Sequence, residues 1–190
     1  RMTAAVDLPT LRLVREAIQG GGQALYLLPE ISLTLPFFDE LRRRAGFEVA
    51  LWHSRLGERR RREVWDGLRR GTVRAVVGAR SACLLPFKDL RIAVVDEEQD
   101  ESYKQEGQAP LYHAREVSLE RARRAGALVL LGSATPSLES AATPSVWVGR
   151  QEHSASDSPR YGLRKACGRV LAPWSTNARP VAGTPWARAS

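Results

Sequence analysis

The sequence predicts an α/β fold in which helices cover a parallel β-sheet. Short apolar runs rich in β-branched residues alternate along the chain with longer segments whose apolar residues recur at helical spacing. This alternation is typical of parallel strands joined by helical crossovers. The apolar runs are unbroken, as expected for strands that are buried on both faces of a parallel sheet. Polar residues follow each run, and such sheets bind ligands at the carboxyl ends of their strands.

The first third of the chain predicts two helices and two strands. Residues 8–19 carry Leu11, Val14 and Ile18 at helical spacing, and the glycines at 20–22 end this helix. A phosphate-binding loop would follow a strand, open a helix and carry a lysine, so we interpret these glycines as a helix-to-strand turn. The next elements are a strand at 24–28, a helix at 35–45 with Thr34 as its N-cap, and a strand at 49–52.

The alternation continues up to residue 140. A strongly charged helix is expected at 58–70, where the arginines at 59–62 could bind phosphates, although a solvated helix face is the more common outcome. Strands are expected at 73–77, 92–95 and 128–131, with a polar loop at 100–110 and a helix at 112–124. His53 follows the second strand and could be catalytic, but a single histidine at such a place is more often a capping or contact residue.

Three adjacent carboxylates, Asp96, Glu97 and Glu98, directly follow the strand at 92–95. Adjacent like charges are tolerated where a strand ends in a polar crevice, especially when a divalent cation shares the site. The same pattern is the Walker B element of nucleotide hydrolases, whose first aspartate holds Mg²⁺ beside the phosphates. For this stretch alone, an exposed acidic turn is an equally good interpretation. The segment GSATP at 132–136, which also follows an apolar run, favours the site.

The positive charge is concentrated at one end of the chain. The 190 residues carry a formal net charge of +8, and residues 141–190 alone hold seven basic and two acidic side chains. The charge is therefore weak support for nucleic-acid binding by the rest of the chain. Cys83 and Cys167 are the only cysteines and form no CxxC pair, so neither a zinc site nor a disulfide framework is expected. The sequence shows no signal peptide or long apolar span, which predicts a cytoplasmic protein.

Residues 141–190 form a separate region in this interpretation. They are rich in Pro, Ser, Ala and Arg, and they show no period of 2 or 3.6 residues. Such a segment buries too little apolar surface to offset the entropy lost on ordering. We therefore expect a partial domain at 8–140 and a disordered tail at 141–190.

Six segments resemble the primosomal protein N′ (PriA) family of replication-restart DNA helicases, within helicase superfamily two. They are LYLLPEISLT at 25–34, WHSRL at 52–56, VGARSACLLPFKDL at 77–90, VVDEEQDESYKQEG at 94–107, YHARE at 112–116 and LGSATPSLES at 131–140. The resemblance covers about residues 11–140 and implies a partial RecA-like helicase ATP-binding domain that uses ATP and Mg²⁺. DNA, single-stranded or forked, and the replication-restart primosome proteins are the implied partners.

The resemblance also implies roles for single residues. Asp96 would hold Mg²⁺, and Glu97 would position or deprotonate the water that attacks the γ-phosphate. Gln99 stands where the family has His, so it can still donate a hydrogen bond but does not titrate. The residues implied to couple nucleotide state to domain movement are Glu98, Ser133, Ala134 and Thr135.

A further set of residues is implied to contact DNA: Pro29, Glu30, Arg80, Ser81, Tyr103, Lys104 and Tyr112. Pro29 and Glu30 match a loop that lies along single-stranded DNA. Residues 103–112 fall where the family has an aromatic-rich loop that senses DNA and triggers hydrolysis, and QAPL at 108–111 interrupts that loop here. Bases stacked on tyrosine would suit binding that does not depend on sequence.

The departures from the family leave three hypotheses. The family's GxGKT loop precedes the helix matching 11–19, and here RMTAAVDLPT at 1–10 takes its place. The second helicase domain with its arginine finger, the zinc module and the N-terminal DNA-binding region have no counterpart, and the tail matches nothing in the family. The first hypothesis is that the chain is a fragment of a replication-restart helicase and has no ATP turnover of its own. The alternatives are an inactive half-domain that binds DNA or a partner, and a translation product of a frameshifted gene.

Overall fold

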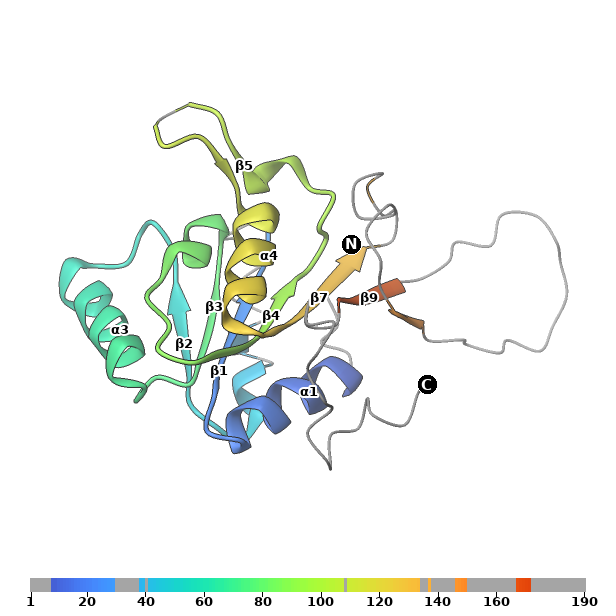
Figure 1. Cartoon of the computed structure of the whole chain (residues 1–190). Coiled ribbons are helices and arrows are strands. Elements are labelled where there is room, and N and C mark those ends of the chain that lie inside the picture. The colour runs from blue at the N-terminus through green and yellow to red at the C-terminus, as the bar shows by residue number, and fades with distance from the viewer. Residues whose placement is uncertain are drawn as a thin grey trace, which may run out of the picture.

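The computed structural model describes residues 8–29, 38–39, 41–107, 109–133, 137, 146–149 and 167–171 (Figure 1). In chain order the elements are α1 (Leu8–Gln19), β1 (Gln23–Leu27), β2 (Val49–Trp52), α3 (Glu58–Arg70), β3 (Ala75–Gly78), the 3₁₀ helix η1 (Arg80–Leu84), β4 (Leu90–Val95), the 3₁₀ helix η2 (Glu101–Tyr103), β5 (Lys104–Gln105), β6 (Tyr112–His113), α4 (Ala114–Ala125), β7 (Leu128–Ser133), β8 (Val146–Gly149) and β9 (Cys167–Leu171). Residues 38–39 and 41–45 are also helical. Within this part of the chain, no helix is long and apolar enough to cross a membrane.

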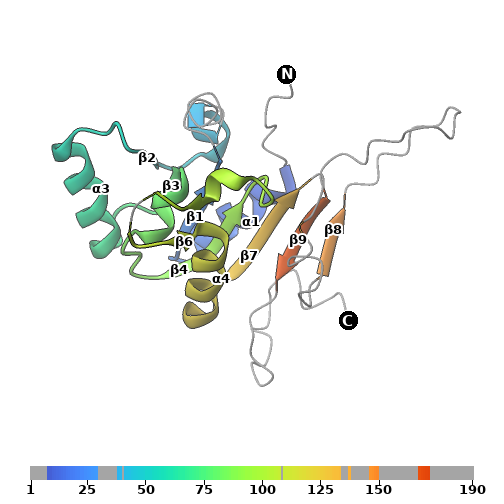
Figure 2. The same ribbon diagram turned by 90° about the horizontal axis from the view of Figure 1, so that it is seen from above.

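Seven strands form one sheet in the order β2-β3-β1-β4-β7-β9-β8. The first five strands are parallel, which confirms the predicted α/β fold with a parallel sheet. β9 runs antiparallel to β7, and β8 runs antiparallel to β9 (Figure 2). Leu27 pairs with Val95, and Val95 pairs with Leu131. The neighbouring strands β1, β4 and β7 therefore reach the carboxyl edge of the sheet at the same level.

A hydrophobic layer lies on each face of the sheet. Leu25 and Leu27 pack on the face that α3 and α4 cover, whereas Tyr26 and Leu28 pack on the opposite face with α1 and residues 41–45. Figures 1 and 2 show α4 and α1 on the two sides of the sheet. Consecutive residues of a strand point to opposite faces. The unbroken apolar runs in the sequence are therefore explained by helices on both faces.

The helix boundaries follow local signals. α1 and α3 have the predicted bounds, and α3 ends at Gly71, whose φ of 79° favours glycine. α4 begins two residues later than predicted because Tyr112 and His113 pair with β5 in a hairpin. This hairpin includes part of the predicted polar loop. His113 then caps α4, since its Nδ1 accepts a hydrogen bond from the N–H of Arg115.

Gln23, the first residue of β1, is a completely buried polar residue. Its Nε2 donates to the carbonyl oxygens of Leu68 (3.0 Å) and Val73 (2.7 Å). Its Oε1 accepts from the N–H groups of Lys88 (2.7 Å) and Asp89 (3.0 Å). One side chain thereby joins the end of α3 and the segment before β4 to the start of β1.

Two strands lie in the region that the sequence predicts to be disordered. Residues 146–149 form β8 and residues 167–171 form β9, and the disorder expected for the tail as a whole stays a prediction. Without β9, the outer edge of β7 would have unpaired N–H and C=O groups, and antiparallel pairing with β9 satisfies them. The other residues of the tail and the predicted domain boundary at 140 lie outside the described residues. The boundary stays a prediction.

Candidate functional site

The carboxyl edge of the sheet gathers polar residues from four strands. Ser54 comes soon after β2, Arg80 after β3 and Asp96 after β4, while Ser133 is the last residue of β7. The parallel register places these strand ends at one edge. Three other candidate site residues, Glu30, Ala134 and Thr135, lie outside the described residues.

Asp96 is fixed by hydrogen bonds of its backbone on both sides. Its N–H donates to the carbonyl oxygen of Leu27 on β1 (3.1 Å), and its carbonyl oxygen accepts from the hydroxyl of Tyr103 (2.6 Å). The carboxylate lies against Gly132 of β7, where an added Cβ atom would stand 2.8 Å from Asp96 Oδ1. This close approach requires a residue without a side chain at position 132.

Glu97 has a left-handed backbone conformation, with φ of 49°. Among the described residues it is the only non-glycine residue with positive φ, and the conformation costs an L-residue about 1–2 kcal/mol. Its N–H donates to Asp96 Oδ1 (3.1 Å), and its carbonyl oxygen accepts from the N–H of Asp100 (2.8 Å). Such strain persists only where the surroundings fix the backbone, and it is common at functional sites.

A chain of hydrogen bonds joins Glu97 to the end of β7. Gln99 Nε2 donates to Glu97 Oε2 (2.7 Å), and the hydroxyl of Ser133 donates to Gln99 Oε1. The amide of Gln99 therefore uses a donor for the carboxylate and its acceptor for the serine, which fixes its orientation. The structure thus brings together three residues that the sequence placed in one site.

Glu98 belongs to a second, buried set of contacts. Its side chain is 1% exposed, and its Oε2 lies 2.8 Å from Nη1 of Arg115 at the start of α4. Ser137 donates its N–H to Glu98 Oε1 (2.8 Å) and its hydroxyl to Oε2 (3.0 Å). Burial lowers the pKa of Arg115, but hydrogen bonds to Glu98 and Glu116 raise it above its ordinary value. The guanidinium is charged inside the protein and depends on the carboxylate for compensation.

Tyr103, one of the candidates for DNA contact, is completely buried. Burial and then the charge of Asp96 raise the pKa of its hydroxyl well above the ordinary value. A base stacks only on a ring that it can reach, so the stacking role expected for Tyr103 does not fit this structure. The sequence missed its burial because the residues around it are polar. What Tyr103 does here is hold the carbonyl group of Asp96.

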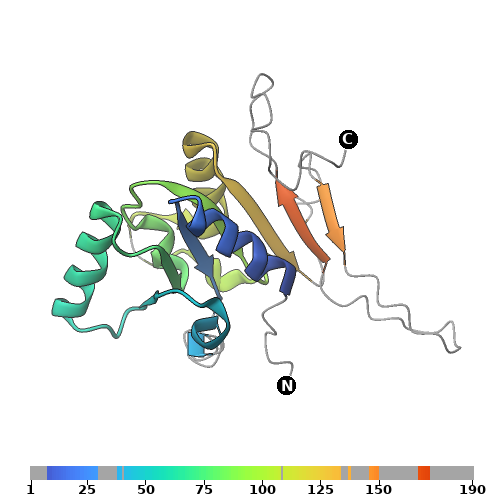
Figure 3. The same cartoon turned by 90° about the horizontal axis from the view of Figure 1, so that it is seen from below.

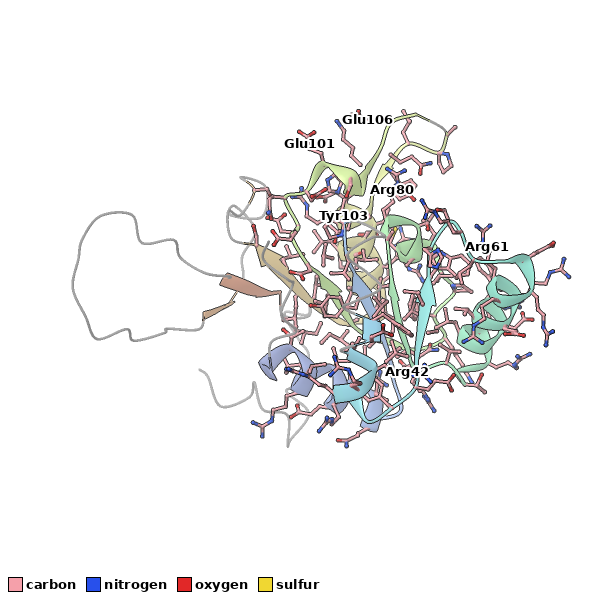
Figure 4. The ribbon with its side chains drawn as sticks, turned by 180° about the vertical axis from the view of Figure 1, so that it is seen from behind. Arg42, Arg61, Arg80, Glu101, Tyr103 and Glu106 are labelled. Atoms are coloured by element: carbon pink, nitrogen blue, oxygen red, sulfur yellow. The ribbon has the colours of Figure 1, made fainter. Side chains whose placement is uncertain are left out.

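The other described candidates for DNA contact are Pro29, Arg80, Ser81, Lys104 and Tyr112, and two of them, Lys104 and Tyr112, lie in the β5–β6 hairpin. Arg80 Nη1 donates to the carbonyl oxygens of Ser102 (3.2 Å) and Lys104 (2.7 Å), at the base of the hairpin. The carbonyl oxygen of Pro29 accepts from the hydroxyl of Ser102 (2.8 Å). Ser81 and Lys104 are exposed, and Tyr112 is half-buried. Figure 4 shows Arg80 and Tyr103 close to the sheet and Glu101 and Glu106 farther out.

Three residues of this site were not predicted from the sequence. Arg115 and Ser137 contact Glu98, and Gly132 leaves room for Asp96. All three lie inside segments that carry the family resemblance, YHARE and LGSATPSLES. Their position inside these segments was the available signal. The spacing of residues in the sequence does not show which of them contact each other.

The described residues suit a metal ion that binds together with phosphate groups. No group of three or more His, Cys, Asp or Glu side chains that could hold a metal ion occurs among them. Mg²⁺ is usually held by one or two carboxylates together with substrate phosphates and water, and Asp96 can supply one carboxylate. Figure 3 shows α1 lying across one face of the sheet.

Comparisons with known proteins match this chain to helicases. The profile of the DEAD/DEAH box helicase family matches residues 3–143. The chain is 44% identical over 130 residues to the replication restart protein PriA of Bacillus subtilis (strain 168), which covers 68% of this chain and 16% of that protein. The replication restart protein PriA of Chlamydia pneumoniae is 42% identical over 130 residues, with coverages of 68% and 17%. That of Haemophilus influenzae is 41% identical over 130 residues, with coverages of 68% and 18%.

One solved structure, described as the DUF1998 helicase MrfA bound to DNA, aligns with a TM-score of 0.37 at 18% identity and covers 46% of this chain and 13% of that chain. The chain spans less than a fifth of the length of the three curated relatives.

Proposed function

Because this chain belongs to the DEAD/DEAH box helicase family, we propose that it carries part of the ATP-binding domain of an ATP-dependent DNA helicase that acts in replication restart. The observation that carries this proposal is the hydrogen-bond chain from Glu97 through Gln99 to Ser133. It connects a carboxylate at a strand end to the neighbouring strand, as coupling between hydrolysis and movement requires. Similarity to the three PriA proteins supports the part in replication restart.

The carboxylate turn, residues 96–99, provides two of the groups that ATP hydrolysis needs from the protein, a metal-holding carboxylate and a base. Mg²⁺, when bound with ATP, offsets the charge that develops on the phosphates. Asp96 supplies the carboxylate that holds this ion. Glu97 orients the attacking water and accepts its proton. Gln99 holds Glu97 Oε2 at 2.7 Å, which directs the carboxylate.

In our proposal, the segment after β7 responds to the nucleotide state through its contacts with this turn. Ser133, with Ala134 and Thr135 after it, is linked to the turn through Gln99. Glu98 is linked to the same segment through Ser137. A change at the turn therefore has two routes to the residues that follow β7.

Single-stranded or forked DNA is the proposed partner at the same edge of the sheet. Lys104 and Ser81 are exposed there and can contact phosphate groups without regard to sequence. Pro29, Glu30, Arg80 and Tyr112 complete the proposed surface, and the buried Tyr103 does not belong to it. Replication-restart primosome proteins as further partners, and a cytoplasmic place of action, are part of the proposal through the similarity to PriA.

We expect no ATP turnover by this chain itself. Residues 1–10 contain neither glycine nor lysine, whereas a phosphate-binding loop needs both. This observation favours a second candidate function, a helicase-like half-domain that binds DNA or a partner without hydrolysis. The assay is phosphate release from Mg-ATP with single-stranded DNA. DNA-stimulated turnover that disappears in the Glu97→Gln variant would contradict the expectation.

The proposed role of Glu97 is tested in a graft, in which residues 11–140 replace the matching segment of the Bacillus subtilis relative. We expect DNA-stimulated ATP hydrolysis by the graft and a loss of about 10²-fold or more on Glu97→Gln, as is typical when a general base is removed. The matched control is Glu101→Gln, which changes an exposed carboxylate outside the turn and is expected to leave the rate unchanged. A folded graft with the same rate after Glu97→Gln would exclude the role.

A further inference from the structure

The β5–β6 hairpin is attached to the carboxylate turn at both of its ends. Tyr103 directly precedes β5, and Arg115 is the second residue after β6. Figure 1 shows the hairpin projecting past the carboxyl end of the sheet, and Lys104 and Glu106 on it are exposed. Tyr103 and Arg115 therefore connect the base of the hairpin to the turn.

Tyr103 contacts one side of Glu97. Its hydroxyl donates to the carbonyl oxygen of Asp96 at 2.6 Å, and that carbonyl belongs to the peptide group between Asp96 and Glu97. The ring is completely buried, so the hydroxyl has a fixed position. The hydrogen bond therefore sets the orientation of the peptide group that precedes Glu97.

Arg115 acts on the other side of Glu97 through Glu98. Its Nη1 lies 2.8 Å from Glu98 Oε2 and 2.6 Å from the hydroxyl oxygen of Ser137. The N–H of Glu98, which belongs to the peptide group after Glu97, donates to the carbonyl oxygen of Gly132 at 2.9 Å. Arg115 thus fixes the side chain of the same residue whose backbone is held by β7.

We propose that Tyr103 and Arg115 are positioning residues that together hold Glu97 in its left-handed conformation. This inference rests on the proposed role of Glu97 in hydrolysis. A left-handed glutamate persists only while the residues around it fix both of its peptide groups. Loosening either side lets the turn relax and moves the carboxylate away from Gln99. Tyr103 and Arg115 thus act on Glu97 through its two neighbours, Asp96 and Glu98.

The position of Arg115 indicates a role beyond filling space. It lies in the first turn of α4, where the helix dipole disfavours a positive charge. It is also buried, with its side chain 7% exposed, and apolar side chains can fill such a place without burying charge. Its contacts with Glu98, Ser137 and Glu116 use separate N–H groups of one planar guanidinium, which lysine cannot reproduce.

The test uses the full chain without ATP, so it does not depend on whether the chain hydrolyses ATP. Backbone chemical shifts in NMR spectra report the conformation of Glu97, and hydrogen exchange reports the amides of Glu97 and Glu98. Tyr103→Phe removes only a hydroxyl, and Arg115→Lys keeps the charge but loses the planar group. In both variants we expect the Glu97 shifts to move toward right-handed values and the two amides to exchange about tenfold faster, as on loss of one hydrogen bond. Amides of β3 keep their rates.

The matched controls are Tyr26→Phe, whose ring packs on the opposite face of the sheet, and Arg123→Lys, on the exposed side of α4. Both are expected to leave the Glu97 shifts unchanged. Unchanged Glu97 shifts in Tyr103→Phe, or equally faster exchange in the turn and in β3, would overturn the inference. If the Arg115→Lys variant does not fold, the Tyr103→Phe variant alone decides whether the inference holds. If ATP hydrolysis by the graft did not depend on Glu97, the proposed role of Glu97 in hydrolysis would be excluded. The chemical shifts of Glu97 would still show whether Tyr103 and Arg115 hold its conformation.

Discussion

Glu98 and Arg115 form an ion pair inside the protein, with 2.8 Å between Oε2 and Nη1 and with side chains that are 1% and 7% exposed. The pair joins the carboxylate turn to the first turn of α4. A buried ion pair adds little stability relative to apolar side chains, but loss of one partner leaves a buried charge without compensation. The two residues should therefore behave very differently when they are replaced singly and together.

Replacing Arg115 with Met should lower the free energy of unfolding by about 3–5 kcal/mol, because Glu98 then lacks its partner. The double variant Glu98→Met/Arg115→Met should recover most of this loss. Urea denaturation followed by circular dichroism measures both. The control is Arg123→Met, which removes an exposed pair with Glu120 and should cost at most about 1 kcal/mol. A double variant less stable than either single variant would contradict this interpretation.

Replacing Gln23 with Leu should lower the free energy of unfolding by about 3 kcal/mol. The reason is that two carbonyl oxygens and two N–H groups lose a hydrogen-bond partner in the core. Gln105→Leu is the matched control, because that side chain makes an exposed bond to the carbonyl of Pro110. Urea denaturation again provides the measurement. Similar losses in the two variants would show that the buried contacts of Gln23 are not important.

Replacing Gly132 with Ala should disturb Asp96, because the new Cβ would stand 2.8 Å from its Oδ1. We expect the free energy of unfolding to fall by about 1–3 kcal/mol and ATP hydrolysis by the graft to fall with it. Gly107→Ala is the control, since no atom lies within 4 Å of a Cβ there. A Gly132→Ala graft with full activity would mean that Asp96 has room to move.

His113 predicts a pH dependence of stability. Its Nδ1 accepts the N–H of Arg115 at 3.3 Å, which requires that nitrogen to be unprotonated. Burial, and then the charge of Arg115, lowers the pKa of His113 from its ordinary value of 6.5. Because the folded-state pKa is the lower one, this stabilisation is present above pH 6.5 and is lost as the pH falls through the folded-state pKa.

The variant His113→Asn isolates this effect, since asparagine caps a helix but does not titrate. Melting temperatures measured between about pH 7 and pH 5 should depend less on pH in the variant than in the original chain. Parallel curves for the two proteins would rule out a contribution from His113.

The carboxyl edge of the sheet could be predicted because its evidence is local in the sequence. Asp96 and Glu97 directly follow an apolar run, and a strand that ends in charge must end at a polar place. Ser133 follows another run, so the ends of two parallel strands placed it near the carboxylates. The sequence therefore predicts that these residues lie close together. It does not predict the hydrogen bonds made by Gln99, because they depend on the orientation of its side chain.

The buried contacts could not be predicted because they depend on tertiary packing. Tyr103 lies among Asp, Glu, Ser and Lys residues, and nothing local separates it from an exposed aromatic residue. Glu98 looks like a third member of an acidic cluster, yet Arg115, 17 residues away, places it in the core. β9 forms because β7 offers an unpaired edge, which no periodicity in the tail records.

A double-mutant cycle in the graft most directly tests whether Glu97, Gln99 and Ser133 act as one unit in ATP hydrolysis. Gln99→Met and Ser133→Ala should each lower DNA-stimulated phosphate release by about tenfold. The double variant should be no slower than the single variants, because either change breaks the same hydrogen-bond chain, and the coupling should be about 1 kcal/mol or more. Independent losses, with the double variant about a hundredfold slower, would contradict the claim.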